Sequence, residues 1–419
     1  MQRLLIALAV ALAVLASCSG AGADPPSPPA SDGGSPTGDA GIFDCRQWQF
    51  VYGGIPGTRS LRDLKFIGGA LYAVIETIHT DWAHHVVMYD TDLQGWVPAG
   101  SNPSNSGIGP ATRLVDYQGL PAIGAGGASC PNGCLGRWTV AFWNPTTDGG
   151  WEPVDEKLPR GSIGALLAEG EFIIAGGSFN SVSRLTAGPE DPVPGTRRIS
   201  LYNPNIEDPG DAWTSLYGGF PSPDTLQVLS LIRFRGDLYA GGYATGDDSR
   251  IRTPAGAGWI APGGGILDGT VHSMTVFEGD LIVGGSFLSV GQVPAVRVAR
   301  WDGFAWHAMG SGLGDPIAAA GVATRVANLV VYQDELYAVG GFRDTGAGLR
   351  VNQIARWNRE DEEWEAVDEN CPGTPQEGCG LDNAQVALVN AGRLLIGASR
   401  WAGGVESPSR SLVAYRACS

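Results

Sequence analysis

The chain has 419 residues, a formal net charge of −16 and 63 glycines, which is about twice the usual glycine share. The acidic balance excludes nucleic acid and anionic lipid headgroups as main partners, because both require clustered Lys and Arg, and the sequence contains no basic run. The glycine content predicts many tight turns and few long helices. The length suits two or three average domains or one long repeat fold.

Residues 1–17 form a secretory signal with one early arginine and an apolar run over 4–16, too short for a stable transmembrane span. Its end, LASC (15–18), resembles a bacterial lipobox, so we expect cleavage before Cys18 and a lipid anchor on this cysteine. The alternative is an ordinary signal, with Cys18 discarded or free. Ser19 in the next position resembles lipoproteins sent to the outer membrane, where the cell has one.

Residues 18–41 consist mainly of Pro, Gly, Ser, Ala and Asp. Such a composition cannot bury apolar surface, so we expect a disordered tether followed by a folded domain over 42–419. The predicted location is extracytoplasmic, with a lipid anchor in the membrane and the domain facing the periplasm or the cell surface.

From residue 46 onward one pattern recurs seven times, at a spacing of roughly 50 residues. In VFEGDLIVGGSF (276–287) two apolar runs flank a two-residue turn, and the second run ends in Gly-Gly, which indicates a β-hairpin. A second hairpin follows, as in VARWDGFAWHAMG (298–310), with an aromatic residue closing one strand and a tryptophan opening the next. Each repeat therefore predicts four strands.

Four strands in each of seven units predict an all-β, seven-bladed β-propeller, because stacking the sheets around an axis buries the faces that one sheet leaves open. The apolar run, the double glycine and the spaced aromatics resemble the kelch repeat, over residues 46–417. Copy seven departs from the pattern, with Gly-Ala in place of Gly-Gly. Copy four departs too, since its third strand is hard to find in SRIRTPAGA (249–257).

The chain ends in a strand, SLVAYR (411–416), with no fourth strand after it. An isolated strand with a tryptophan, RQWQFVY (46–52), stands near the N-terminus with no hairpin before it. We expect this N-terminal strand to complete the last blade, with Trp48 in the place that Trp306 takes in blade five. The ring would then be closed by pairing the two ends of the chain.

Seven cysteines less Cys18 leave six, which allow 15 pairings. Export to an oxidising compartment favours disulfides, and the predicted ring closure brings the first and last of the six together. A thiolate metal site is the alternative, although the C-x₃-C spacing occurs once. The expected pairs are Cys45–Cys418, Cys130–Cys134 and Cys371–Cys379.

Alternating strand direction places all the longer connections at one end of the ring and the short turns at the other. Since binding residues are commonly found on loops held by a rigid scaffold, we expect the long-loop end to be the binding surface. Two tryptophans outside the repeat register come from the neighbouring blades one and seven. With nearby charged residues they form the candidate rim site: Trp82, Trp401, Arg343, Asp344 and Arg400.

Several motifs have a plainer interpretation than the chemistry they suggest. HTDWAHH (79–85) offers His79, Asp81 and His84 to a metal, but a polar loop entering a strand explains it better. YDTDLQGW (89–96) partly matches a calcium loop and equally fits a turn. The tripeptide Arg235-Gly236-Asp237 occupies an ordinary hairpin turn of the repeat. We therefore predict no metal and no cofactor.

Two function classes remain. The first is a lipid-anchored binding or scaffold propeller that presents its long-loop end to a protein or a glycan. The second is an oxidase or hydrolase whose site is assembled across blades at the axial mouth, where a cluster of acids or histidines would be the mark of it. A copper radical oxidase resembling galactose oxidase needs a cysteine free to cross-link to a tyrosine, and the predicted disulfides use every one.

Overall fold

The computed structural model describes residues 47–50, 55, 58–77, 84–100, 110–126, 139–144, 150–155, 157–184, 192–206, 211–221, 225–246, 248–315, 324–351, 353–367, 381–401 and 412–416. The chain divides into two units, 1–44 and 45–419, and all described residues belong to the second. The predicted signal, the Cys18 anchor and the tether lie outside them. Within these ranges the chain is all-β apart from one 3-10 turn, η2 (Pro262–Gly264), and contains no helix able to span a membrane.

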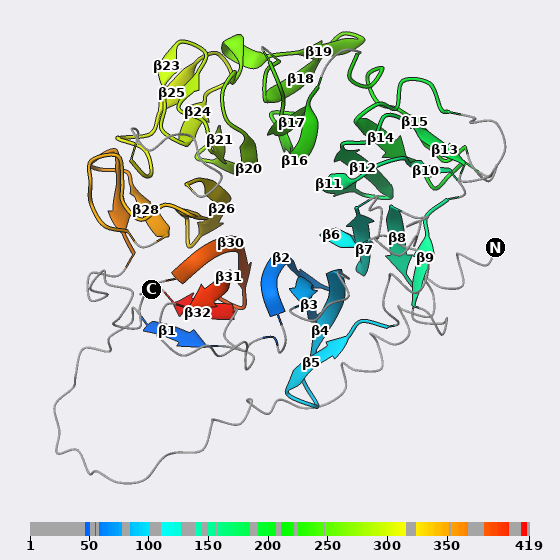
Figure 1. Ribbon diagram of the computed structural model, residues 1–419, viewed down its shortest axis with the longest axis horizontal. Coiled ribbons are helices and arrows are strands. Elements are labelled where there is room, and N and C mark those ends of the chain that lie inside the picture. The colour runs from blue at the N-terminus through cyan, green and yellow to red at the C-terminus, as the bar shows by residue number, and fades with distance from the viewer. Residues whose placement is uncertain are drawn as a thin grey trace. The chain divides into compact units, whose positions relative to one another are not determined.

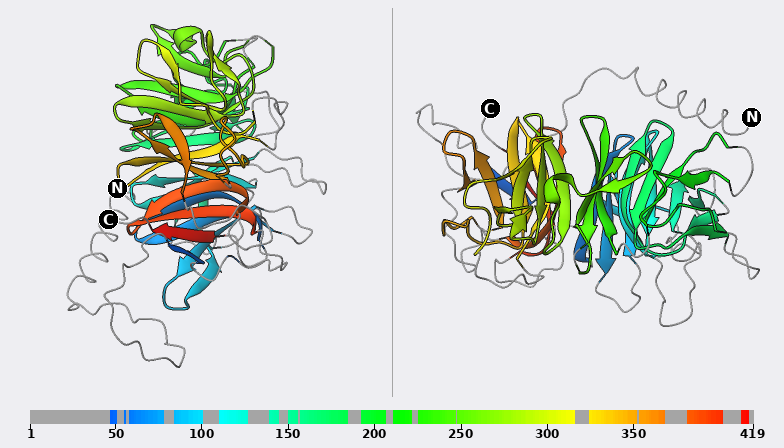
Figure 2. Two further views of the ribbon diagram at one scale, coloured as in Figure 1. Left: turned by 90° about the vertical axis from the view of Figure 1, so that its left-hand side faces the viewer. Right: turned by 90° about the horizontal axis from the view of Figure 1, so that it is seen from above.

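The unit is a seven-bladed β-propeller of four-stranded antiparallel blades, as the repeat predicts (Figures 1 and 2). Each blade is given from its innermost to its outermost strand. Blades one to four are β2 (Thr58–Ile67), β3 (Ala70–Thr77), β4 (His84–Asp90) and β5 (Gly95–Pro98); β6 (Ala111–Tyr117), β7 (Leu120–Ala125), β8 (Val140–Trp143) and β9 (Trp151–Pro153); β11 (Ile163–Glu169), β12 (Phe172–Gly177), β14 (Ile199–Tyr202) and β15 (Trp213–Ser215); and β16 (Gln227–Phe234), β17 (Asp237–Tyr243), β18 (Ile251–Ala255) and β19 (Gly258–Ile260).

The remaining blades follow the same order, and two short hairpins are added to the connections. Blades five to seven are β20 (Val271–Phe277), β21 (Asp280–Gly285), β24 (Val298–Trp301) and β25 (Trp306–Ala308); β26 (Val326–Tyr332), β27 (Glu335–Gly340), β28 (Ile354–Asn358) and β29 (Glu363–Ala366); and β30 (Leu381–Asn390), β31 (Arg393–Trp401), β32 (Leu412–Arg416) and β1 (Gln47–Phe50). The small two-stranded sheets pair β10 (Lys157–Pro159) with β13 (Val182–Arg184) and β22 (Ser289–Val290) with β23 (Val293–Pro294).

The ring is closed by the two ends of the chain, as predicted. Strand β1 pairs with β32 and completes blade seven, with Trp48 opposite Tyr415 as Trp306 is opposite Trp301 in blade five. Around the axis each innermost strand contacts the next, and β30 contacts β2 (Figure 1). The doubtful third strand of copy four is β18, which pairs with β17 and β19.

The double glycine of the repeat is required by two different neighbours. A Cβ on Gly284 would lie 2.5 Å from Cγ1 of Val326 in the next blade, and a Cβ on Gly285 would lie 1.9 Å from the carbonyl oxygen of Thr270. The first glycine thus lets adjacent blades approach each other. The second lets its strand lie close to the backbone at the start of the innermost strand of the same blade.

The core lies between the blades, and the tryptophans that open the outermost strands connect neighbouring blades by hydrogen bonds. Trp151, Trp306 and Trp364 are buried, and each indole N–H donates to a carbonyl oxygen at the end of the preceding blade. Buried indole groups usually have such a partner. Trp213 is buried too, and Trp96 and Trp259 are partly buried against the core, so the recurring tryptophans with described side chains are core residues, as expected.

Candidate functional site

Both ends of the ring can be assigned from the strand directions. Consecutive strands of a blade are antiparallel, so each innermost strand begins at the end where the second and third strands are connected. Among the described residues this end carries the connections 178–184, 192–198, 286–297 and 341–351, and we call it the long-loop end. The short turns between first and second strands mark the opposite, short-turn end.

The long-loop end is braced from inside by a buried arginine. Arg297 has no exposed surface, and its guanidinium donates to the carbonyl oxygens of Thr324, Leu313 and Asp315 at 3.1 Å each. It ties a connection of blade five to the crossover that enters blade six. The loops at this end are therefore held by the scaffold where they are described.

Every innermost strand has a β-bulge near its start, at the same place in the repeat. The extra residue re-aims the side chains around it, and bulges of this kind are frequent beside functional sites. The register shifts lie between Leu61 and Asp63, Ala111 and Arg113, Ile163 and Ala165, Val228 and Ser230, Val271 and Ser273, Val326 and Asn328, and Ala384 and Val386.

Four cationic or titratable side chains lie at or beside these bulges, in four different blades. Arg62 and His272 are the extra residues of blades one and five, Arg113 follows the extra residue of blade two, and Arg325 directly precedes β26 of blade six. The Arg62 side chain is 43% exposed, and the other three are half-buried. We call these four residues the axial basic cluster.

The members of the cluster act on one another electrostatically across blades. Burial, together with the charges of Arg325 and Arg113, lowers the pKa of His272 to about 4. Burial also lowers the pKa of Arg113 and of Arg325, and the charge of Arg62 adds to the effect in both, whereas the carboxylate of Asp63 raises the pKa of Arg113. Like charges held close together in a partly buried place favour the arrival of an anion.

The carboxylates nearest the cluster are occupied by neighbours. Asp63 accepts the backbone amides of Leu64 at 2.8 Å and of Leu114 in the next blade at 2.7 Å. Glu76 pairs with Arg62 at 2.6 Å and accepts the hydroxyl of Ser60 at 2.9 Å. The arrangement can bind an anion, and His272, neutral at pH 7, can donate or accept a hydrogen bond there.

This cluster is not evident from the sequence, because Arg62, Arg113 and Arg325 stand singly and far apart in it. The signal that relates them is that each lies within a few residues of the start of an innermost strand. A gathering of acids or histidines at the axial mouth is expected to mark an enzyme, and among the described residues His272 is there with arginines as its charged neighbours.

The rim site predicted from the sequence is described in part. Arg343 is exposed and Asp344 half-buried on the long-loop end, where Asp344 pairs with Arg350 at 3.4 Å and its carbonyl oxygen accepts the amide of Gly314 at 2.6 Å. Part of the charge of Asp344 is therefore neutralised within its own loop.

The rest of the rim site is not fixed by the structure. Arg400 and Trp401 form the end of strand β31, rather than a loop, and pair with Asp382 and Leu381. Their side chains, and Trp82 as a whole, lie outside the described residues. The six cysteines proposed to form disulfides lie outside them too.

The plain interpretation holds for two of the other motifs. Asp90 turns its carboxylate onto the backbone amides of Asp92 and Leu93, both at 2.9 Å, which is an ordinary turn between β4 and β5. Arg235-Gly236-Asp237 is the turn between β16 and β17. In the described part of the chain, no group of three or more His, Cys, Asp or Glu side chains is placed to hold a metal ion.

No known protein family and no curated protein matches this sequence. Among solved structures, the chain resembles one in the crystal structure of the Mitotic Checkpoint Complex, with a TM-score of 0.48 and 11% identity over 95% of this chain and 99% of that one. It also resembles PorZ, a bacterial surface component of the type-IX secretion system of Porphyromonas gingivalis, with a TM-score of 0.48 and 13% identity over 86% of this chain and 47% of that one. The computationally designed Ika8 protein gives a TM-score of 0.43 and 11% identity over 88% of this chain and 100% of its own.

Proposed function

We propose that this protein is an extracytoplasmic binding propeller that holds an anionic group of a protein or glycan partner at its long-loop end. The observation that carries the proposal is the axial basic cluster, in which Arg113 and Arg325 act electrostatically on His272 of another blade and Arg62 acts on both of these arginines. The net charge of the whole chain is −16, so a local gathering of arginines stands out as a site rather than as general surface.

The fold is compatible with a binding or scaffold role, because a rigid ring can hold loops from several blades around one partner. Arg343 and Asp344 lie on the same end and are the described members of a surrounding contact surface. The resemblance of the repeat to kelch sequences supports the same class. A lipid anchor on Cys18 would place this propeller at the cell envelope, as a lipoprotein.

The binding proposal is tested by cross-linking the purified full chain to envelope extract and comparing it with the double variant Arg62→Gln, Arg325→Gln. A species captured by the native chain, released by raising the ionic strength and lost in the variant supports the proposal. The thermal midpoint of the variant is measured in parallel, so that loss of folding is recognised. Capture that the variant leaves unchanged contradicts the proposal.

The location is tested separately, by fractionating cells that produce the native chain or the variant Cys18→Ser. The native chain is expected with the membranes and the variant in the soluble fraction, because acyl chains on a single cysteine hold a protein to the bilayer. An unchanged distribution would contradict lipid anchoring without touching the binding proposal.

A further inference from the structure

Blades five and six differ in one row of side chains that crosses the sheet. In blade six the row is Tyr337, Arg356 and Glu365, on β27, β28 and β29. At the same places in blade five it is Ile282, Arg300 and His307, on β21, β24 and β25. The arginine is common to both blades, and its outer neighbour changes from a carboxylate to an imidazole.

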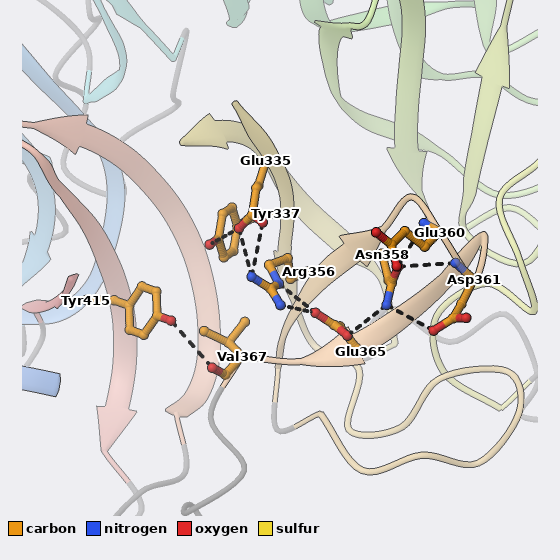
Figure 3. A network of polar contacts seen from close by, with 9 residues as sticks. All are labelled: Glu335, Tyr337, Arg356, Asn358, Glu360, Asp361, Glu365, Val367 and Tyr415. Carbon is orange, nitrogen blue, oxygen red and sulfur yellow. Dashed lines mark hydrogen bonds and ion pairs between the residues drawn. The ribbon is translucent and has the colours of Figure 1, made fainter. Parts of the chain in front are cut away.

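In blade six the arginine lies between two carboxylates (Figure 3). Arg356 donates to Glu335 at 2.9 Å on one side and pairs closely with Glu365 on the other, and the Tyr337 hydroxyl donates to Glu335 at 3.1 Å. Burial opposes the charge of Arg356, but the two carboxylates outweigh it and raise its pKa. In blade six the charge of Arg356 is therefore balanced on both sides by carboxylates of the protein itself.

In blade five the second carboxylate is missing. Arg300 pairs with Asp280 at 2.6 Å, and Asp280 also lies 3.6 Å from Arg235 of blade four. The place of Glu365 is taken by His307, which points its ring nitrogen to Asp302 at 2.7 Å. Two arginines thus share one carboxylate, and the Arg300 side chain remains 41% exposed.

The incomplete row faces a cleft of about 430 Å³ between blades five and six, within the range of small-ligand pockets. Arg300 and His307 line it from blade five. Trp357 and Arg359 line it from blade six, and the Cζ atom of Arg359 lies over the Phe277 ring, 5.0 Å from its centre. The lining runs from the short turn at Glu278 to Met309 and Gly310, which follow the outermost strand β25, so the cleft lies along the outer strands rather than at the axis.

We propose that this cleft binds a carboxylate-bearing sugar, whose carboxylate takes beside Arg300 the place that Glu365 takes beside Arg356. A guanidinium recognises a carboxylate through two parallel hydrogen bonds, and the blade-six row shows that this scaffold accommodates a second carboxylate at that point. The site is independent of the proposed long-loop function.

The other lining groups favour a sugar over a bare carboxylate. Asp280, Glu278 and Glu362 line the cleft and offer carboxylate oxygens to the hydroxyl groups of a sugar ring. Trp357 contributes an aromatic surface against which the apolar face of such a ring can pack. Glu278 is already paired with Arg359 at 3.0 Å. An acidic peptide would bring several negative charges to a cleft lined by three carboxylates, whereas a sugar with one carboxylate brings a single charge.

The proposal is tested by calorimetric titration of the purified full chain with an oligosaccharide that contains glucuronic acid. The two comparison probes are the same oligosaccharide with its carboxyl reduced to an alcohol, and a tetraglutamate peptide. We expect binding of the acidic sugar, at least tenfold weaker binding of the reduced sugar and still weaker binding of the peptide.

Three variants sharpen the test. Arg300→Gln should weaken binding of the acidic sugar at least tenfold, and His307→Glu should do the same because it supplies the missing carboxylate from within. Arg233→Gln is the matched control, since Arg233 is an ion-paired surface arginine of blade four with 36% exposure. It should leave binding unchanged.

His307→Glu keeps the test decisive if Arg300→Gln folds poorly, because it reproduces a row that blade six already accommodates. Absence of binding, equal binding of the reduced sugar, preference for the peptide, or unchanged affinity in folded His307→Glu protein would each overturn the proposal.

Discussion

Blades five and six have the same strand order, the same cross-strand register and the same central arginine, yet their electrostatics differ. In blade six Arg356 is satisfied by Glu335 and Glu365, whereas in blade five Arg300 has Asp280 alone and faces a cleft. The two blades share their backbone arrangement, but a few side chains at equivalent positions differ. The exchange of Glu365 for His307 separates an ion-pair network in blade six from a candidate binding site in blade five.

The largest expected effect concerns what the two blades share. A Cβ on Gly285 or Gly340 would lie 1.9 or 2.0 Å from the carbonyl oxygen of Thr270 or Arg325. Gly285→Ala and Gly340→Ala should therefore each lower the free energy of unfolding by about 3 kcal/mol, measured by chemical denaturation. Gly258→Ala, with open space around its Cβ, is the control. A large effect in one blade only would contradict their equivalence.

The next effect concerns the bulge, where blade five has His272 and blade six has Ala327. Burial lowers the folded-state pKa of His272 from 6.5 to about 4, so its contribution to stability is complete above pH 6.5 and is lost as pH falls towards 4. The loss reaches at most about 3 kcal/mol. Thermal midpoints between pH 7 and 4 should fall less steeply in His272→Ala than in the native chain. Parallel curves would contradict the assignment.

A smaller effect separates the two arginines. Arg356→Gln leaves Glu335 and Glu365 without their shared cation and should cost about 2 kcal/mol. Arg300→Gln should cost less than about 1 kcal/mol, because the pair is more exposed and Asp280 retains Arg235. Urea denaturation of both variants measures the difference. Equal losses in the free energy of unfolding would show that Arg300 is paired as fully in blade five as Arg356 is in blade six.

The smallest effect concerns the turn beside the cleft, where blade five has Asp302 and blade six has Asn358. The amide of Ala305, the side chain of His307 and the amide of Phe304 hold the pKa of Asp302 far below its ordinary value of 3.8. Its stabilisation is present above that value and is lost only as pH falls through the lower folded-state pKa. Asp302→Asn should have a slightly lower thermal midpoint than the native chain at pH 7, and the difference should shrink as pH falls below 4. Equal midpoints at pH 7, or a difference that does not shrink in acid, would contradict this.

The fold could be predicted because each repeat reports the same backbone geometry. The register of Trp48 with Tyr415 follows from that of Trp306 with Trp301, although β1 and β32 lie at opposite ends of the described chain. The described ladder ends with Gln47 opposite Arg416. The predicted Cys45–Cys418 disulfide falls outside the described residues and stays a prediction.

The sites could not be predicted in the same way, because they depend on differences between repeats. Arg62, Arg113 and Arg325 are ordinary surface residues when each is taken alone, and only the ring places them at the starts of innermost strands around one axis. The exchange of Glu365 for His307 has meaning only once both strands are aligned across the sheet. The positions that all repeats share define the fold, and the candidate sites lie at the positions where the repeats differ.

The pairing of β1 with β32 has a kinetic consequence. During synthesis β1 is made before every other described strand, but its hydrogen-bonding partner β32 is the last of them to be made. Until then blade seven lacks its outer strands, and the backbone amides and carbonyls of β1 have no strand to pair with. Contacts between such distant segments form slowly, so the ring closes only after β32 has been made. Until then β1 can pair with the edge of another molecule instead.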